Sequence, residues 1–540
     1  MVHICSSPLE LEDTHFSTDA LVIVGTKNGF QNHFASACSG VLKVLLQQEK
    51  NCAIPESKKP RLVNEELDLL QSIVTGLQPS LDSGSSTECW LRRPAKNKLL
   101  KVVLGVLPNS VSRHNAPGQP HAITSLLKKH VHPKEPTVIL PLCESSDYVL
   151  STVCAIARVG GAFMYSRKTG GEKKRTTEID IRETLNMSAN YIRVLFPFSI
   201  ERKLQDQMAQ LAFGIQFTRR LVDAPANDLN TQTFTEQVLE AIKGFKDVKS
   251  RIIKGQDLKQ QGFGGLWGVG KAAVHPPAMV ILTYEPPSAK GQQSIALVGK
   301  GIVFDTGGLQ IKTKVGMPGM KRDMGGAAAI FSAFLSVVRS GTTLNRPLHA
   351  ILCLAENAVA ANATRADDIL TLYSGKTVEI NNTDAEGRLV LSDGVASAID
   401  HLNPKVIIDM ATLTGAQGVA TGKYFGAVYC NDEKLERIAV EAGRESGDLC
   451  HPVPYAPEFF RPEFQSAVAD MKNSVADRAN AQVSCAGQFI GNHMGAFLEN
   501  GGQWMHIDMA YCCYDKKDER ATGYGVALLH SVIQKLSASL

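Results

Sequence analysis

The sequence predicts an α/β protein of two domains, each a mixed or largely parallel sheet flanked by helices. The chain has 540 residues, which is more than a single hydrophobic core usually organises. Short apolar runs alternate with segments of helical length, and strands that are apolar throughout are typical of parallel sheets covered on both faces. We place the boundary near residue 200, which predicts an N-terminal α/β domain at 1–200 and a C-terminal domain at 201–540.

The N-terminal part contains alternating apolar runs and helix-like segments. Strands are predicted at 20–25, 99–106 and 137–141. A helix is predicted at 148–159, where apolar residues fall on one face. Residues 78–97 are rich in Ser, Pro and Gly and are predicted to form a loop. Ser199 is a candidate N-cap for a long helix at 201–221, which would link the two domains.

In the second half of the chain, predicted strands and helices alternate more clearly than in the first half. Strands are predicted at 278–284, 294–304, 348–354 and 405–411. Helices are predicted at 325–339, 389–401, 433–446 and 523–536. Ligands of such sheets collect at the carboxyl ends of the strands. Asp305 directly follows the strand that ends at Phe304, so it lies where a functional side chain is expected.

Composition favours a soluble globular protein. The net charge of +4 argues against nucleic-acid binding, and the basic run within 167–175 is interleaved with glycines and is expected to be a solvated loop. No apolar run reaches ~18 residues, and the N-terminus lacks a charged-then-apolar signal region. The twelve cysteines show no paired CxxC spacing, which favours reduced thiols. We therefore expect a cytoplasmic protein that does not span a membrane.

Two stretches, 298–326 and 381–389, place charged residues among small residues and apolar runs. Their charged residues include four carboxylates, Asp305, Asp323, Asp384 and Glu386, and the cations Lys300, Lys312 and Arg388. Charges beside buried chain are costly unless they are paired or hold metal. Carboxylate oxygens suit Mg²⁺, Mn²⁺ and Zn²⁺. A two-metal site and a structural ion-pair network both fit this pattern.

Two further features are expected to be structural. The run from Gly265 to Ala272 resembles a phosphate-binding loop, but Ala272 replaces the hydroxyl residue that would hold Mg²⁺. We predict a tight glycine loop beside the sheet of the second half at this position. His506 lies in an apolar strand and is expected to be a hydrogen-bonded structural histidine.

The run from Asn381 to Leu389 contains, unchanged, the N-T-D-A-E-G-R-L signature of the cytosolic leucyl aminopeptidase family. The chain resembles this family of di-metal exopeptidases over about residues 205–535, and the resemblance implies that the C-terminal domain removes N-terminal residues from peptides. Residues 1–200 carry no motif that we can place. Departures from the commonest family pattern fall at 309–314, 317–322 and 468–478, and Lys314 and the segment 317–322 make the rim of the site more basic. They resemble a divergent branch of probable aminopeptidases and leave the preference for leucine open.

The resemblance implies a ligand set for two divalent metal ions, with Zn or Mn expected and Mg or Co as further candidates. Asp305 and Glu386 would bridge the metals, Lys300 and Asp323 would complete one metal's ligands, and Asp384 would bind the other. A lysine can bind metal only as the neutral amine, which requires a strongly lowered pKa that an adjacent dication can cause. Water bridging the two metals would lose a proton and attack the peptide carbonyl.

Lys312 and Arg388 are the candidate catalytic residues. Lys312 would stabilise the tetrahedral intermediate, and Arg388 resembles the family arginine that holds a small anion, bicarbonate, as a proton shuttle. The resemblance also implies a homohexamer. The alternative is a catalytically silent structural or DNA-binding homologue, which loss of ligands would mark, yet all five predicted metal ligands are present. An enzyme acting on another substrate, such as a cysteinyl-glycine dipeptide, remains a third possibility.

Overall fold

The computed structural model describes residues 2–12, 18–47, 59–93, 98–132, 135–159, 164–166 and 192–539. The chain divides into two compact units, the first containing most residues up to Gln216 and the second most residues from Phe217 onward. The division falls within helix α6 (Arg202–Asp223). The assignment of 1–200 and 201–540 as domains stays a prediction, because compactness alone does not show which part folds independently. The basic run at 167–175 lies outside the described residues.

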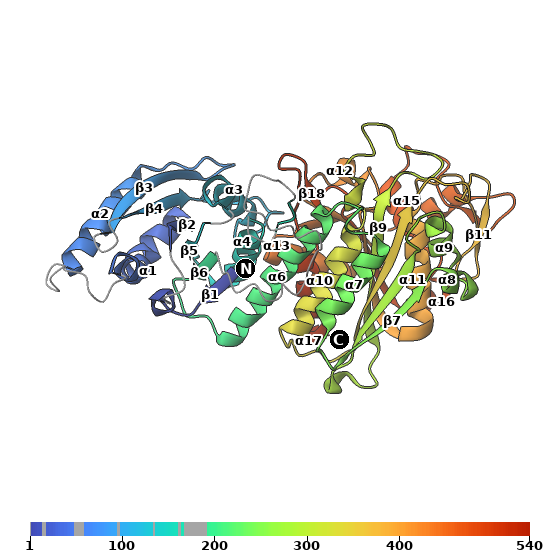
Figure 1. Cartoon of the computed structure of the whole chain (residues 1–540), viewed down its shortest axis with the longest axis horizontal. Helices are drawn as coiled ribbons and strands as arrows, with labels where there is room; N and C mark the ends of the chain where they lie inside the picture. Colours follow the sequence, from blue (N-terminus) through green and yellow to red (C-terminus); the bar gives the residue numbers. More distant parts are fainter. Residues whose placement is uncertain are drawn as a thin grey trace. The chain divides into compact units, whose positions relative to one another are not determined.

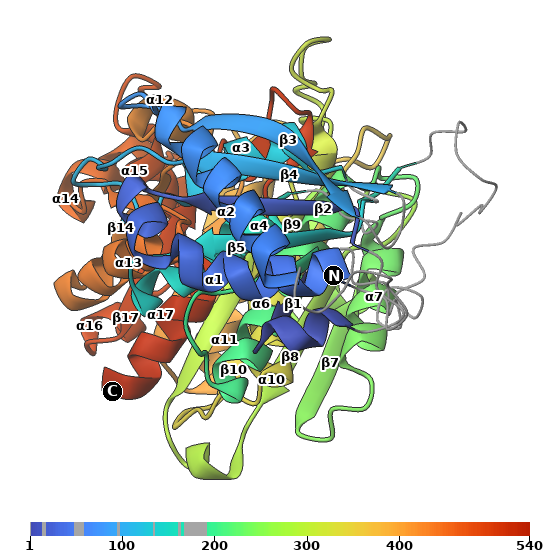
Figure 2. The same cartoon turned by 90° about the vertical axis from the view of Figure 1, so that its left-hand side faces the viewer.

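The first unit is built on a six-stranded sheet (Figure 2). The strand order is β1 (Val2–Cys5), β6 (Ile192–Leu195), β5 (Thr137–Leu142), β2 (Ala20–Gly25), β4 (Lys98–Val106) and β3 (Ser85–Arg93). Only the β3–β4 pair is antiparallel. Among the described residues, this unit contains α1 (Lys27–Gln47), α2 (Lys59–Gly76), α3 (Pro120–His130), α4 (Val149–Ala157) and the first part of α6. Helices α1 and α2 pack together against the sheet, and their apolar residues form its core with alternate residues of the strands.

Strand β3 corrects the prediction of a loop at 78–97. It pairs antiparallel with β4 over its whole length, from Ser85 opposite Val106 to Arg93 opposite Lys98. Strand β3 is difficult to predict from the sequence because it lies at the edge of the sheet. At an edge, polar residues such as Glu88 and an exposed Trp90 are tolerated on the solvent side.

The second unit is built on an eight-stranded sheet (Figure 1). The strand order is β15 (Cys450–Pro452), β14 (Gly426–Cys430), β17 (Gln503–Asp508), β13 (Pro404–Ala411), β9 (Ser294–Asp305), β10 (Leu348–Asn357), β8 (Ala278–Tyr284) and β7 (Val248–Lys254). The central strands β17, β13, β9 and β10 are parallel, whereas β14–β17, β10–β8 and β8–β7 pair antiparallel. Two small sheets join β11 (Ile369–Thr371), β12 (Thr377–Glu379) and β16 (Met471–Lys472), and β18 (Tyr514–Asp515) with β19 (Arg520–Ala521).

Helices cover both faces of this sheet. One face carries α7 (Thr231–Ile242), α10 (Gly325–Arg339) and α17 (Val526–Ser539), and the other carries α9 (Gly264–Gly270), α11 (Gly387–Leu402) and α15 (Gln482–Gly491) (Figure 1). Shorter or peripheral helices are α8 (Gln256–Gln260), α12 (Gln417–Ala420), α13 (Glu433–Ser446), α14 (Pro457–Phe460) and α16 (Gly495–Glu499). One core lies between the sheet and the helices of this second face. Val298 of β9, Ile351 of β10 and Val395 of α11 are fully buried in it. The predicted α/β class with two sheets flanked by helices is confirmed.

Among the described residues, no helix combines the length and the apolar character that a membrane crossing requires.

Candidate metal centre and active site

The predicted site residues of the second unit meet at the carboxyl ends of its parallel strands. Asp305 is the last residue of β9, Asn357 is the last residue of β10, and Thr412 directly follows β13. Glu386 immediately precedes α11, and Asp323 lies two residues before α10. Because the parallel strands end along one edge, residues far apart in the sequence converge there.

Three buried carboxylates form the centre of the site. Asp305, Asp323 and Glu386 each offer an oxygen atom, and these atoms lie within 4.8 Å of one another. Lys300 Nζ lies 2.8 Å from both Asp323 Oδ2 and Glu386 Oε1, and it donates a hydrogen bond to the backbone oxygen of Thr412. Lys300 pairs with these two acids and not with Asp305, which contacts Lys312 instead.

Helix α11 begins at Gly387, which lies directly against the end of the Lys300 side chain. A Cβ atom on Gly387 would lie 2.7 Å from Lys300 Nζ, which is closer than real Cβ contacts allow. The glycine of the signature run therefore makes room for the lysine beside Glu386.

Lys312 connects the central carboxylates to Asp384. Its Nζ lies 2.7 Å from Asp305 Oδ2 and 2.5 Å from Asp384 Oδ1. Asp384 does not join the three buried carboxylates, since its side chain remains 36% exposed. The loop that carries Lys312 turns at Gly307, whose φ of 86° and 2.9 Å Cβ approach to Asp384 Oδ1 exclude a larger residue.

Gln310, Thr383 and Asn357 hold this loop against the signature run. The backbone N–H of Gln310 donates to Thr383 Oγ1 at 2.9 Å, and the Thr383 N–H donates back to Gln310 Oε1. Gln310 Nε2 also donates to the Asn381 oxygen at 3.2 Å. Asn357 Nδ2 bridges Asp305 Oδ1 at 2.8 Å and the Thr383 oxygen at 3.1 Å. These positioning roles were not predicted, although Asn357 ends an apolar strand as Asp305 does.

Asn473 holds the signature run from its other side. This fully buried side chain accepts hydrogen bonds from the N–H groups of Asn381 and Asn382 and donates to the oxygens of Asn382 and Ala385. Arg388 Nη1 donates to the backbone oxygen of Asn473 at 3.0 Å. Asn473 lies more than 80 residues from the run, so no local sequence signal identifies it.

Arg388 does not pair with the carboxylates, and part of its guanidinium lacks a partner. Its buried Nε has no hydrogen-bond partner among the described residues. Burial lowers the pKa of Arg388 to about 10, so the group remains charged at neutral pH. A charged, buried donor without a partner is costly, and a small anion at this position would satisfy it.

The electrostatics of the centre favour additional positive charge. Burial raises the pKa of Asp323 well above its ordinary value, and burial also raises the pKa of Glu386 and of Asp384. Burial alone would lower the pKa of Lys300, but Asp323 and Glu386 outweigh it and raise that pKa, so the amine is an ammonium in this arrangement. With all four acids ionised, their charge would exceed that of the two ammonium groups by two, and neighbouring carboxylates accordingly add to burial in raising these pKa values.

Glu386 gives a direct test of whether a metal fits. Its Oε2 is buried and has no hydrogen-bond partner among the described residues. A purely structural ion-pair network would be expected to satisfy this oxygen, since an unpaired buried carboxylate oxygen is costly. The orphaned oxygen, the excess negative charge and the oxygen-rich donor set all fit divalent cations.

Two expectations about surrounding residues have different outcomes. His506 Nδ1 lies 2.5 Å from Asp409 Oδ1 in a fully buried pair, as expected for a structural histidine. Lys321 donates to the backbone oxygen of Asp223 and Arg322 lies 4.8 Å from the centre of the Tyr514 ring, while the basic character of the rim stays a prediction.

Both units match the models of known protein families. Residues 216–530 match the catalytic domain of the cytosol aminopeptidase family. Residues 19–171 match an N-terminal domain of M17 aminopeptidases, described as domain 2. The family match thus extends over the whole described carboxylate cluster and over most of the first sheet.

Similar proteins agree with this assignment. The chain is 48% identical to the probable aminopeptidase NPEPL1 of Mus musculus over 81% of this chain and 80% of that protein. It is 41% identical to leucine aminopeptidase 1 of Caenorhabditis elegans, over 83% and 86% of the two chains. The solved structure of Trypanosoma brucei leucyl aminopeptidase in complex with bestatin matches with a TM-score of 0.82 and 35% identity, covering 99% of this chain and 95% of that one. The chain therefore belongs to the cytosol aminopeptidase family, M17.

Proposed function

We propose that this chain hydrolyses N-terminal residues from peptides in a metal-dependent reaction at the carboxylate cluster of its second unit. The observation that carries the proposal is the convergence of Asp305, Asp323 and Glu386, with Glu386 Oε2 buried and unpartnered, in a member of an aminopeptidase family. The relatives named as aminopeptidases support the same activity. No observation favours a silent structural or DNA-binding homologue.

Five side chains would hold two divalent cations, namely Lys300, Asp305, Asp323, Asp384 and Glu386. Bound cations would supply an activated water and polarise the scissile carbonyl. Zn and Mn are the candidates we favour, with Mg or Co as further ones. Lys300 now occupies the space between Asp323 and Glu386 as an ammonium, so it would have to give up a proton to serve as a ligand.

Lys312 and Arg388 would act on charge that develops during the reaction. Lys312 is partly exposed at the edge of the carboxylate cluster, so its ammonium can approach the carbonyl oxygen of a peptide as negative charge builds on it. The unpaired Nε of Arg388 supports a role in holding a small anion such as bicarbonate, which would accept a proton. The side chain of the preferred N-terminal residue is left open.

Hydrolysis assays distinguish an active enzyme from a silent homologue. The chelator-treated protein should be inactive toward leucyl-aminomethylcoumarin and should regain turnover when Mn²⁺ or Zn²⁺ is restored. The matched N-acetylated substrate should not be cleaved, because the reaction requires a free amino terminus. Absence of turnover with every metal tested would favour the silent homologue.

We further propose that the protein is a cytoplasmic homohexamer in which residues 1–200 and 201–540 form separate domains. Support comes from family membership and from the division of the chain into two compact units. Light scattering should give a particle six times the chain mass of 58.4 kDa. A monomer at micromolar concentration would contradict the assembly and leave the proposed activity untouched.

A further inference from the structure

The first unit contains a second group of side chains with the chemistry of metal ligands. His3, Cys5 and Glu10 offer a nitrogen, a sulfur and an oxygen atom, and these three atoms lie within 4.8 Å of one another. Among the described residues, the only other group of this kind is the set of three buried carboxylates in the second unit. The two groups differ in chemistry, because the carboxylates offer oxygen alone.

Local structure brings these three residues together. His3 and Cys5 are two residues apart in β1, so their side chains point to the same face of the sheet. The chain then forms the 3-10 helix η1 (Pro8–Glu12), which packs on β1 and carries Glu10. The backbone N–H of Ser6 donates to Glu10 Oε1 at 3.1 Å, and the Ser6 hydroxyl donates to the same oxygen. Ser6 thus orients the carboxylate, as partners of metal ligands commonly do.

The other oxygen of Glu10 faces the imidazole of His3 at a separation typical of two ligands of one metal ion. Glu10 Oε2 lies 3.6 Å from His3 Nε2, which is longer than a good N–H···O hydrogen bond. Zinc in tetrahedral sites binds nitrogen and oxygen at about 2.0–2.2 Å and sulfur at about 2.3 Å, which places neighbouring ligand atoms roughly 3.3–3.8 Å apart. The observed separation falls within this range.

The thiol of Cys5 is buried beside this pair and has no hydrogen-bond partner among the described residues. Cys5 is 4% exposed, and its sulfur lies within 4.8 Å of the ligand atoms of His3 and Glu10. Burial raises the pKa of the Cys5 thiol to about 12, whereas the positive charge of Arg193 acts in the opposite direction and favours the thiolate. A dication at this position would displace the thiol proton, which leaves to solvent.

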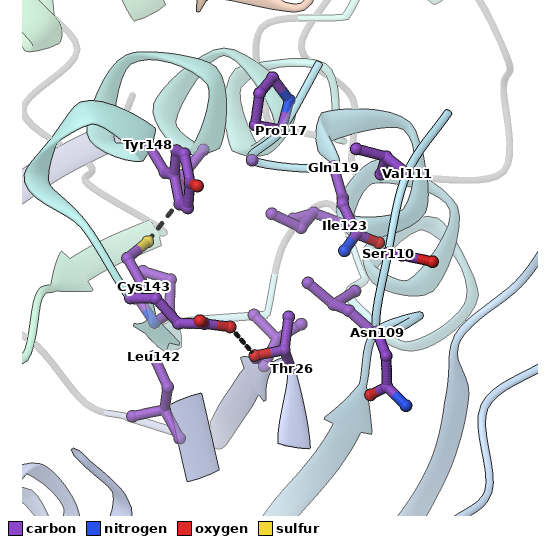
Figure 3. Close-up of a pocket in the computed structure, with 17 residues that line it drawn as sticks. Thr26, Asn109, Ser110, Val111, Pro117, Gln119, Ile123, Leu142, Cys143 and Tyr148 are labelled. Atoms are coloured by element: carbon purple, nitrogen blue, oxygen red, sulfur yellow. Dashed lines mark hydrogen bonds between the residues drawn. The ribbon is translucent and has the colours of Figure 1, made fainter. Parts of the chain in front are cut away.

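The cavity of the same unit offers no comparable set of ligands. It lies at the carboxyl ends of β2, β4 and β5, and no histidine lines it (Figure 3). The Sγ of Cys143 lies 3.5 Å from the hydroxyl of Thr152 (Figure 3). The carboxylate of Glu144 accepts a hydrogen bond from the hydroxyl of Thr26 (Figure 3). Both groups therefore already have protein partners, in contrast to the thiol of Cys5.

We propose that His3, Cys5 and Glu10 bind one zinc ion per chain, with water as the fourth ligand. A thiolate and an imidazole select zinc over Mg²⁺ or Mn²⁺, which carboxylates alone would suit. The ion would tie η1 to β1, which is an edge strand of the first sheet. The site uses no residue of the carboxylate cluster, so its occupancy does not depend on the proposed peptidase activity.

Titration of the chelator-treated full-length protein with Co²⁺ tests the proposal, because cobalt accepts tetrahedral zinc sites and reports its ligands by absorption. A thiolate bound to Co²⁺ gives a sulfur-to-metal charge-transfer band in the near ultraviolet, and oxygen and amine ligands do not. The band should saturate at one cobalt ion per chain and disappear when Zn²⁺ is added. Absence of the band at saturating Co²⁺ would overturn the proposal.

A matched pair of cysteine variants assigns the band. Cys5→Ser should lose it and should bind one zinc ion fewer per chain. Cys89→Ser, at a half-buried thiol of β3, should keep both the band and the zinc. A band that survives Cys5→Ser would refute the site. Cys5→Ser should also keep the wild-type peptidase turnover, and a wild type without turnover would leave the cobalt result intact.

His3 supplies a second test that does not alter the buried thiol. Its side chain is 40% exposed, so His3→Asn should leave the fold intact, which thermal unfolding checks. The affinity for Co²⁺, read from the sulfur band, should fall at least about a hundredfold, which is as much as the loss of an outer partner of a ligand can cost. His33→Asn, on α1, is the control and should bind like the wild type. Unchanged affinity in His3→Asn would contradict the proposed ligand set.

Discussion

Lys300 and Lys312 each contact two carboxylates, but their surroundings differ. Lys300 is 2% exposed and lies between two buried acids, whereas the side chain of Lys312 is 17% exposed and reaches the more open Asp384. A lysine buried among these carboxylates is placed to help them hold the metal ions. A lysine at the edge is placed to meet a substrate.

Substituting each lysine by alanine tests this difference. Lys312→Ala should lower kcat roughly 10²–10³-fold by analogy with the loss of one oxyanion donor, because the ammonium acts on charge that appears in the transition state. Its metal content should be unchanged. Lys300→Ala should instead lower the metal content. Metal analysis and kinetics on both variants check these two roles. Loss of metal from Lys312→Ala, or full activity with both metals in Lys300→Ala, would show that the roles are reversed or wrong.

Gln310 provides a second test at this scale. Gln310→Ser removes the side-chain hydrogen bonds to Thr383 and Asn381 that hold the Lys312 loop. We expect kcat to fall roughly tenfold with KM and metal content little changed, since about 1 kcal/mol per lost hydrogen bond loosens the loop. Lys314→Ser, at an exposed position of the same loop, is the control and should behave like the wild type. Equal kcat values for the two variants would remove Gln310 from the positioning scheme.

Sequence reasoning found the charged residues of the site and missed most of the neutral ones. Asp305 follows an apolar strand, and Asp384 and Glu386 lie in an unchanged family signature, so spacing and resemblance both identify them. Asn357 carries the same strand-end signal as Asp305 and could have been found. Asn473 could not, because its hydrogen bonds reach back to a distant segment through the fold.

The four strands and four helices that were predicted in the second unit lie close to observed elements, because their apolar faces are continuous. Helix α10 spans the predicted residues, and β9 and β13 differ from prediction by about one residue at their ends. The prediction of a tight glycine loop at Gly265 to Ala272 was wrong, because helix α9 spans Gly264–Gly270. Its glycines permit close packing on α11, where a Cβ on Gly265 would lie 2.5 Å from the Leu389 oxygen, and Asp393 accepts from the Leu266 N–H. Tertiary contact overrides the poor helix propensity of glycine here.

The packing of α17 on α10 predicts a pH dependence of stability. His530 of α17 is fully buried and contacts Ser336 Oγ of α10 at 3.0 Å. Burial lowers the pKa of His530 from 6.5 to about 4. Between these values the unfolded chain binds a proton that the folded chain does not, so stability is present above pH 6.5 and is lost as the pH falls toward 4.

His530→Gln should reduce this pH dependence. From pH 7 to pH 5 the wild type should lose roughly 2 kcal/mol more free energy of unfolding than the variant, at about 1.36 kcal/mol per pKa unit. Urea denaturation at both pH values measures the difference. His132→Gln, at an exposed position, serves as the control and should follow the wild type. A variant as pH-sensitive as the wild type would exclude His530 as the source.

At the scale of the whole molecule, each unit presents a feature at the carboxyl edge of its own sheet. The second unit gathers the carboxylates at the ends of β9 and β10 and beside α11. The first unit forms its cavity at the ends of β2, β4 and β5. Resemblance predicted the former, and residues 1–200 offered no motif for the latter, because backbone turns and neutral polar residues form most of its wall.

The central claim is that the carboxylate cluster holds catalytic metal, and metal content measured together with turnover tests it most directly. The cluster of the wild-type protein should hold two divalent ions per chain, counted beyond the one proposed for the first unit, whereas Asp384→Ala and Glu386→Ala should each lose metal and activity while keeping the circular dichroism spectrum of the fold. Asp400→Ala, an exposed acid on α11, should match the wild type. Full activity with both cluster metals bound in either Asp384→Ala or Glu386→Ala would contradict the account.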